Sequence, residues 1–200
     1  MLKNYFKIAW RNLMKYKFIS FINLFGLTVG LTCCLLITTY VLNELSYDRY
    51  NKNAENIYRV TRSFNNAAGV VSLKFGTISP PFGYYFPTDF PEIKKMTRLL
   101  GAGTLPFKYK DKIIAENNVY FADENLFNVF TLKTLEGNPQ TALKDPFSAM
   151  LTEEVAKKYF GNEDPVNKVI KINNQFDVKV TGIYKGFPEN SFMHPDVLLS

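Results

Sequence analysis

The sequence predicts an α+β protein with one N-terminal transmembrane helix and an extracytoplasmic domain of mixed α+β structure. Three observations support this prediction. Residues 18–42 form an apolar stretch without a charged residue, and five cations and no anion precede it. About 150 residues follow, in which short strand-like runs alternate with short helical ones. The pattern favours a membrane-bound protein over a soluble enzyme.

The apolar stretch, Phe18 to Leu42, is 25 residues long. As a helix it would extend roughly 37 Å, enough to cross a hydrocarbon core of about 30 Å with some tilt. The cations lie on one side only, because Glu44 and Asp48 are balanced after the stretch by Arg49 alone. The positive-inside rule therefore predicts a cytoplasmic N-terminus and an outer domain over residues 47–200.

Two kinds of cleaved segment are alternatives to a membrane anchor. The apolar region of a signal peptide is about 7 to 15 residues long, so this stretch is too long. Leu31-Thr32-Cys33 resembles a lipoprotein signal, but Thr32 replaces the small residue expected before the cysteine, and the apolar run continues past Cys34. We therefore expect an uncleaved anchor.

The leader, residues 1–17, is predicted to be an amphipathic helix that lies flat on the inner membrane surface. Trp10 and Tyr16 favour the interface, although a plain charged flank that continues the spanning helix is the alternative. The leader holds most of the net charge of +6, so nucleic acid is not an expected partner. The five interfacial basic residues are Lys3, Lys7, Arg11, Lys15 and Lys17.

Within the apolar stretch, Gly26 and Gly30 form a GxxxG pattern, and Asn23 lies one turn earlier. Two glycines one turn apart allow another helix to approach closely, although glycine is also common in membrane helices by chance. A single isolated anchor needs none of these residues. We therefore expect this face to pack against other membrane helices.

The outer part is expected to contain short strands and short helices in one domain. Asp123 is a candidate N-cap for a short helix that ends near Phe130, and prolines open another helix after Ser79. Strands are predicted at residues 57–62, 95–100, 106–109 and 113–119, the last two joined by a turn at Lys110-Asp111.

The clearest helix begins after Thr152 as its N-cap and ends at Gly161. A hairpin follows over residues 168–184, with its turn at Asn173-Asn174. Residues 195–200 are predicted to be a last strand without a partner, and we expect the domain to be incomplete at its C-terminus. The core is expected around Phe160, Val169 and Val180.

No catalytic, cofactor or metal site is predicted. The sequence lacks a GxxxxGK[ST] phosphate loop and a GxGxxG motif, so we expect no ATP hydrolysis by this chain. His194 is the one histidine and is expected at the surface. Glu153 and Glu154 suit the positive end of a helix better than acid–base chemistry.

Two segments near the membrane are NYFKIAWRNLMKYKFISFINLFGLTVGL and ENIYRVTR, and the outer part contains ADENLFNVFTLKTLEGNPQTAL, LTEEVAKKYFGNEDPVNKVIKINN and VTGIYKGFPENS. The first two resemble the start of ABC-transporter permeases of the MacB/FtsX type, and the other three are similar to the MacB-like periplasmic core domain. The resemblance covers nearly the whole chain, and Asn167 departs from it at a turn where the family usually has glycine. Asparagine tolerates left-handed backbone geometry, so the turn is expected to survive.

The resemblance implies a permease subunit, or the N-terminal portion of one, in a bacterial inner membrane. Such a subunit couples ATP hydrolysis by a partner ATPase to movement of an outer domain that exports or extracts amphiphiles. Its expected partners are the lipid bilayer, an ABC ATPase, and further transmembrane helices or a second permease copy. A stand-alone membrane-anchored binding module is the alternative, and a membrane-tethered enzyme is a weaker one.

Overall fold

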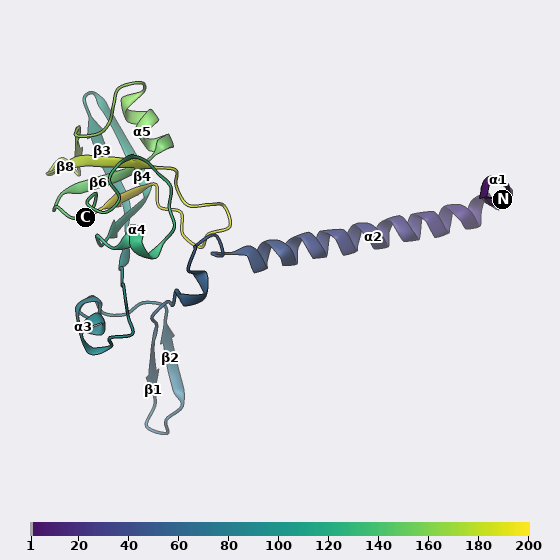
Figure 1. Cartoon of the computed structure of the whole chain (residues 1–200), viewed down its shortest axis with the longest axis horizontal. Coiled ribbons are helices and arrows are strands. Elements are labelled where there is room, and N and C mark those ends of the chain that lie inside the picture. The colour runs from purple at the N-terminus through teal and green to yellow at the C-terminus, as the bar shows by residue number, and fades with distance from the viewer. Residues whose placement is uncertain (1) are drawn as a thin grey trace. The chain divides into compact units, whose positions relative to one another are not determined.

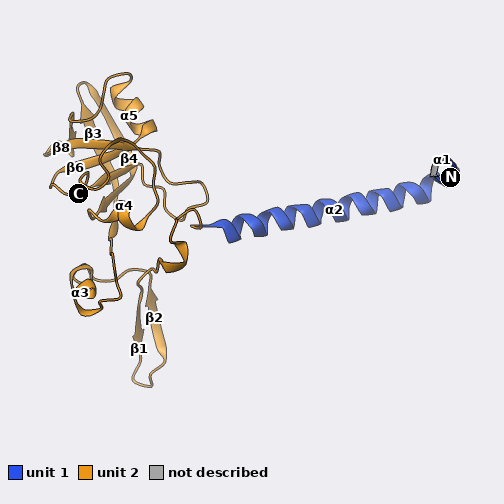
Figure 2. Cartoon of the chain, in the orientation of Figure 1, with its two compact units in different colours: residues 1–47 blue, residues 48–200 orange. Residues whose placement is uncertain are grey.

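The computed structural model describes residues 2–200, which separate into two compact units on either side of the Tyr47–Asp48 bond (Figure 2). The first unit contains helices α1 (Leu2–Lys15) and α2 (Lys17–Ser46). The second unit combines strands with short helices, so the fold class is α+β as predicted. Its helical elements are a 3₁₀ turn (Ala54–Asn56), α3 (Phe82–Asp89), α4 (Leu126–Val129) and α5 (Glu153–Phe160).

Strands β1 and β2 of the second unit form a hairpin of their own, and the other seven form one sheet (Figure 1). Six of those seven close into a barrel: β8 pairs with β6, then β9, β4, β3 and β7 follow in order, and β7 returns to β8. Strand β5 adds to β8 outside the ring. The bounds are β1 (Arg62–Asn65), β2 (Val71–Phe75), β3 (Leu99–Tyr109), β4 (Lys112–Ala122), β5 (Thr134–Gly137), β6 (Ser148–Thr152), β7 (Val169–Ile172), β8 (Phe176–Tyr184) and β9 (Val197–Leu199).

Two apolar clusters lie on opposite faces of the barrel wall. All six ring strands contribute to one cluster, which therefore fills the interior, and α5 packs into it through its apolar face. The second cluster lies outside the wall, where Leu126 of α4 covers Met150, Tyr184 and Leu198. Strands β6 and β9 are thus covered on both faces, which explains why their sequences are apolar without alternation.

The prediction that residues 195–200 lack a strand partner was wrong. Strand β9 lies between β4, to which it is parallel, and β6, to which it is antiparallel. Val197, Leu198 and Leu199 are all buried. A continuous apolar run such as Val197 to Leu199 does not indicate how many strands lie beside it, so neither partner could be predicted from the local sequence.

The capping prediction for α5 and the predictions of the turns at Asn167 and at Asn173-Asn174 were confirmed. The Val155 amide donates to Thr152 Oγ1 at 3.4 Å, and α5 ends at Gly161 with φ of 63°. The β7–β8 turn has left-handed geometry at Asn173 and Asn174, and Asn167 adopts φ of 68°. Side-chain amides and glycine tolerate this region, so each turn uses a residue suited to it.

Other local predictions were wrong. Residues 57–61 form no strand, since β1 begins only at Arg62, and β3 begins at Leu99 instead of Lys95. Val169 is half exposed because β7 points its neighbours Ile170 and Ile172 into the barrel. In each case apolar and polar residues alternate in the sequence as they do in a strand. The position of the neighbouring strand nevertheless decided where the strand begins and which side chains are buried.

Candidate functional site

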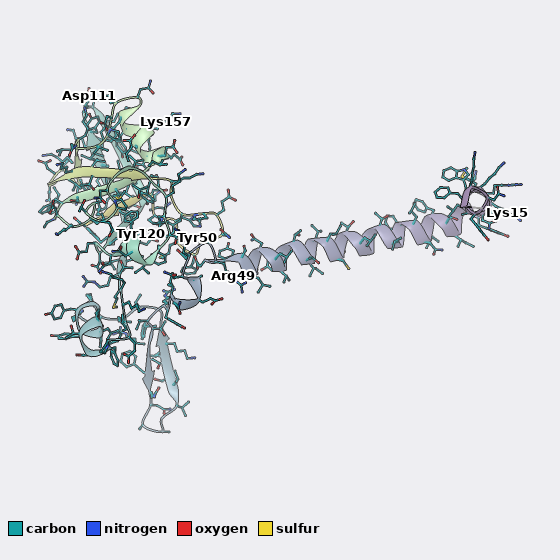
Figure 3. All side chains as sticks on the ribbon, in the orientation of Figure 1. Lys15, Arg49, Tyr50, Asp111, Tyr120 and Lys157 are labelled. Atoms are coloured by element: carbon teal, nitrogen blue, oxygen red, sulfur yellow. The ribbon has the colours of Figure 1, made fainter. Side chains whose placement is uncertain are left out.

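Helix α2 is the one helix in the described residues 2–200 that is long and apolar enough to cross a membrane. It has 30 residues, an 18-residue window within it has a mean hydropathy of 2.0, and its side chains point outward along its length (Figure 3). Its threonine hydroxyls donate to carbonyls one turn earlier, for example Thr28 Oγ1 to Leu24 at 2.7 Å. Such internal bonds satisfy polar groups that lipid cannot.

The predicted packing residues lie on one face of α2. Gly26 and Gly30 are one turn apart, and a Cβ added at either would meet no atom within 4 Å. Asn23 lies one turn before Gly26 and is exposed. The face is therefore flat and open in this chain, as close helix packing requires.

The predicted basic residues occupy α1 and the start of α2. Lys3, Lys7, Arg11 and Lys15 form one stripe along α1 because they recur every four residues. Lys17 begins α2. The opposite side of α1 presents Phe6, Ala9 and Leu13, so the described helix is amphipathic.

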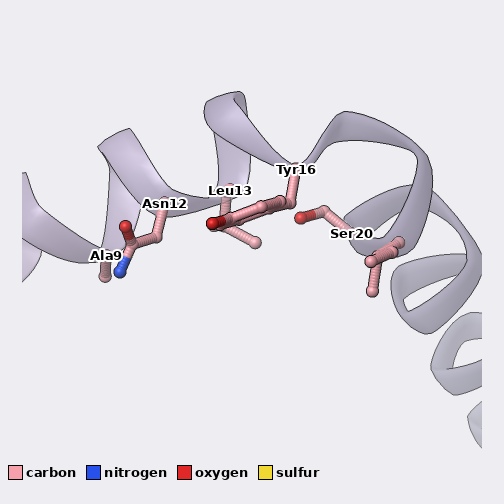
Figure 4. A pocket seen from close by; sticks show the side chains of 6 residues that line it. Ala9, Asn12, Leu13, Tyr16 and Ser20 are labelled. Atoms are coloured by element: carbon pink, nitrogen blue, oxygen red, sulfur yellow. The ribbon is translucent and has the colours of Figure 1, made fainter.

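The chain bends between α1 and α2 at Tyr16 (Figure 4). Hydrogen bonds from Tyr16 to Asn12 and from Ser20 to Tyr16 carry the backbone through the bend. An open hollow of about 570 Å³ lies inside it, lined by Ala9, Asn12, Leu13, Tyr16, Ile19 and Ser20. A largely apolar hollow of this kind suits a lipid chain better than a polar ligand.

In the second unit, residues 57–98 form a segment that we call the arm, which carries β1, β2 and α3. Arg98 joins the arm to the barrel. Its Nε and Nη2 donate to the two Asp123 oxygens at 2.8 and 2.7 Å, and its Nη1 donates to the Pro80 carbonyl at 3.2 Å. Hydrogen bonding to Asp123 raises the pKa of Arg98. Asp123 therefore binds Arg98 and does not cap α4. The prediction that Asp123 is the N-cap of this helix was wrong.

A second contact holds the arm at its other end. The Arg59 guanidinium lies over the Phe192 ring, 5.4 Å from its centroid, and its Nε donates to the Gly76 carbonyl at 3.1 Å. The loop that carries Phe192 is fixed in turn by Asp48, whose Oδ1 accepts from Ser191 Oγ at 3.0 Å. The two arginines thus connect an exposed arm to a packed barrel.

A carboxylate network fixes α5 on the barrel. Glu116 of β4 is almost buried and accepts bonds from Lys158 Nζ at 2.8 Å and from Tyr159 OH at 2.7 Å. Burial, followed by the hydrogen bond to Glu116, raises the pKa of Tyr159. Both partners of the carboxylate come from α5, so the network anchors the helix to β4.

Sequence reasoning missed Arg98 and Glu116, because their partners lie 25 and more than 40 residues away. His194 is exposed, as was expected, and Glu153 and Glu154 are exposed in the first turn of α5. Within the described residues, no group of three His, Cys, Asp or Glu side chains could hold a metal ion.

The family model of the MacB-like periplasmic core domain matches residues 20–200. The chain belongs to this family. The resemblance to MacB/FtsX-type permeases that the sequence indicated is therefore confirmed. Together with α2, the family indicates a membrane-anchored chain with an extracytoplasmic domain. A search of the curated proteins found no match.

Three solved structures are similar to this chain, and the first of them supports the same kind of fold. A domain of a candidate permease from Porphyromonas gingivalis has a TM-score of 0.58 at 20% identity, over 70% of this chain and 60% of that one. The periplasmic region of MacB from Actinobacillus actinomycetemcomitans has a TM-score of 0.42 at 20% identity, covering 56% and 53%. The extracellular domain of the noncanonic ABC-type transporter YknZ from Gram-positive bacteria has 0.40 at 14%, covering 56% and 58%. The chain thus spans 60% of the first of these structures.

The structure gives physical reasons for the family's sequence blocks in the MacB-like domain. Gly137 begins the Gly137-Asn138-Pro139 block of the segment ADENLFNVFTLKTLEGNPQTAL. It has φ of 85° and lies so close to β8 that a Cβ would collide with the Thr181 carbonyl. At Gly182, a Cβ would lie 2.6 Å from the Glu136 carbonyl. The block Lys157-Lys158-Tyr159-Phe160-Gly161 contains Lys158 and Tyr159, which bind Glu116. These blocks build the barrel.

Proposed function

We propose that this chain is a permease subunit of an ABC transporter, or a portion of one, that couples ATP hydrolysis by a partner ATPase to movement of its outer domain. The family match carries this proposal, because it includes both most of α2 and the whole second unit. The substrates proposed are amphiphiles that are exported or extracted from the bilayer.

The charge pattern supports a cytoplasmic N-terminus in the inner membrane. Residues 1–17 contain five cations and no anion, and the second unit begins directly after α2. In this orientation α1 lies on the cytoplasmic surface, where its basic stripe meets anionic lipid headgroups and its apolar side enters the interface.

The proposed contact with other membrane helices is the face of Asn23, Gly26 and Gly30. Because this face has no side-chain bulk, a partner helix can approach the backbone, and Asn23 can donate a hydrogen bond across the interface. The partner helix belongs to the remaining transporter or to a second permease copy. The ATPase is expected to bind the complex that α2 forms with these other membrane helices.

The experiment is purification of the tagged chain from its native membranes in mild detergent, followed by identification of co-purifying ABC ATPase. We expect the Gly26→Leu/Gly30→Leu variant to retain less ATPase than the wild type, since bulk at both glycines keeps a partner helix away from the backbone. Thr28→Leu adds similar bulk on the opposite face of α2 and should retain it. A reporter fused after Ser200 should be active only if it is exported. Its activity therefore checks the orientation of the chain in the membrane.

A wild-type chain that purifies without any ABC ATPase or other membrane helices would contradict the proposal. That result would favour the alternative, a stand-alone membrane-anchored binding module. Equal loss of ATPase in the glycine and Thr28 variants would instead show that the glycine face is not the contact.

A further inference from the structure

The five residues from Asp48 to Lys52, which we call the attachment segment, begin two residues after the end of α2. The segment contains no glycine, serine or proline, the residues that are typical of linkers between domains. Its residues instead bind two loops of the barrel, one at Thr131 and one at Ser191. All of these contacts lie within the second unit.

The first loop and the attachment segment exchange hydrogen bonds in both directions. The Thr131 amide donates to Asn51 Oδ1 at 2.8 Å, and the Lys52 amide donates to Thr131 Oγ1 at 3.0 Å. Asn51 Nδ2 donates to the Asp48 carbonyl at 3.0 Å, so both ends of the Asn51 side-chain amide are bonded. Asn51 is only 5% exposed. Because an unpaired buried polar group is costly, these partners fix the position of Asn51.

The second loop is bound by Asp48 through its backbone and its side chain. The Asp48 amide donates to the Asn190 carbonyl at 2.9 Å. Asp48 Oδ1 accepts from Ser191 Oγ at 3.0 Å and from the Phe192 amide at 3.2 Å. Ser191 is 2% exposed, and its Oγ also lies 3.3 Å from the Tyr50 hydroxyl. The segment therefore meets this loop at a buried hydroxyl group.

The backbone of Asp48 is an independent sign that the segment is fixed. Asp48 has φ of 56°, in the left-handed region that residues other than glycine seldom adopt. Aspartate tolerates this region better than most residues, but such a conformation persists only where the surroundings determine it. The bonds to Asn51 and to the second loop supply those surroundings.

Both loops are themselves fixed to the barrel wall. Phe130, which precedes Thr131, and Phe187 pack against the apolar cluster outside the wall, and their ring centroids are 6.0 Å apart. The Lys185 amide donates to the Lys133 carbonyl at 3.0 Å, which extends the antiparallel pairing of β8 with β5. Bonded and packed groups thus connect the attachment segment to the strands of the barrel.

We propose that the attachment segment fixes the barrel to the end of its membrane anchor, with Asn51 and Ser191 as the residues that position it. The bonds to both loops remove the freedom of a linker, so the joint between the two units is confined to the backbone around Tyr47. In the transporter proposed above, the attachment transmits movement of α2 to the barrel. That use rests on the proposed function, whereas the attachment itself does not.

The experiment measures distances between two spin labels in the full chain, embedded in nanodiscs of phosphatidylcholine and phosphatidylglycerol. Cys33 and Cys34, the only cysteines, are first replaced by serine. The first label pair, Arg49→Cys with Lys157→Cys, joins the attachment segment to the exposed side of α5 (Figure 3). The second pair, Asn43→Cys with Lys157→Cys, also includes the joint at Tyr47. All three labelled positions are exposed.

We expect a narrow distance distribution for the 49–157 pair in the otherwise wild-type chain. Asn51→Ala/Ser191→Ala removes side-chain bonds to both loops and should widen the distributions of both pairs about twofold, because the segment then becomes a longer linker. Thr181→Val is the matched control. It removes hydroxyl bonds to two carbonyls inside the barrel, at 2.7 and 3.0 Å, and should leave both widths unchanged.

A pair of milder variants tests the attachment without removing a buried amide. Thr131→Val keeps the shape of the side chain but loses the Oγ1 that accepts from the Lys52 amide, whereas Thr131→Ser keeps this acceptor. The 49–157 distribution should widen in Thr131→Val and stay as in the wild type in Thr131→Ser. A role in packing alone would not separate the two variants in this order.

Three outcomes would overturn the proposal. The first is a 49–157 distribution of equal width in the wild type and in the Asn51→Ala/Ser191→Ala variant. The second is equal widening in Thr181→Val, which would assign the effect to a general loss of stability. The third is a 43–157 distribution that the double variant does not widen. None of these measurements needs the ATPase, so its absence from the purified chain would contradict the proposed function and leave the attachment to be decided by the distances.

Discussion

The barrel and the arm belong to one compact unit, yet they bury their side chains very differently. Every strand of the barrel contributes at least one side chain to a buried cluster, whereas no residue from 57 to 98 is buried. Both regions are rich in Phe, Tyr and Leu. Composition therefore does not decide which region is core; the number of strand partners does.

The same comparison explains where each region can change. Closing the ring of β8, β6, β9, β4, β3 and β7 gives each of those six strands a partner strand on both sides, although β3 and β7 pair at only two positions. The arm keeps two short strands and two arginine contacts to the rest of the unit. We infer that local opening begins in the arm and that the barrel moves as one body.

The largest difference is expected from one substitution made in both regions. Leu198→Ala removes a fully buried side chain of β9 and should lower the free energy of unfolding by about 2–5 kcal/mol. Leu73→Ala removes a side chain that is 57% exposed and should change it by less than about 0.5 kcal/mol. Urea unfolding of the full chain in detergent measures both.

This pair also checks the position of β9 by an independent method. If Leu198 lies between two partner strands, the amides of residues 197–199 should exchange hydrogen as slowly as those of β6 and β8. Similar costs for the two leucine variants, or rapid exchange at β9, would show that the last strand is not part of the barrel core.

The parts of this fold that depend on neighbours in sequence could be predicted, and the parts that depend on distant partners could not. Helix α5 has its cap, its dipole partners and its stop within ten residues, and the β7–β8 turn is defined by Asn173 and Asn174. The barrel closes through parallel pairs, β4 with β9 and β6 with β8, whose partners are separated by many residues. No local pattern specifies such a pair.

The candidate site divides in the same way. The glycine face and the basic stripe follow from helical spacing alone, because residues three and four apart share a face. Arg98 and Asp123 could not be paired from sequence, since both are common surface residues and 25 positions separate them. Their ion pair depends on how the arm returns to the barrel.

A smaller effect is expected at the joint between the two regions. Arg98→Ala removes the bonds to Asp123 and Pro80 but should cost less than about 1 kcal/mol of global stability, because the ion pair is partly exposed. Proteolysis within the arm and hydrogen exchange of β1 and β2 should nevertheless speed up several-fold. The control is Lys171→Gln, which breaks an exposed ion pair between Lys171 of β7 and Asp177 of β8, both strands of the barrel. If the arm is equally protected in both variants, Arg98 is not what fixes it.

The smallest effect on stability is expected from the surface ion pairs of Glu163, which join the β3–β4 turn to the segment after α5. Lys110 and Lys168 donate to Glu163 at 2.6 and 3.3 Å, and these bonds, that of Lys110 first, lower the pKa of Glu163. A carboxylate with a lowered folded-state pKa adds stability above its ordinary pKa, near 4.5, and loses it as the pH falls through the lowered value. Glu163→Gln should therefore reduce the midpoint of thermal unfolding slightly at pH 7 and flatten its fall below the ordinary pKa of glutamate. The amide of Glu163→Gln cannot titrate, so a variant with the same acid limb as the wild type would show that this pair contributes nothing to the barrel.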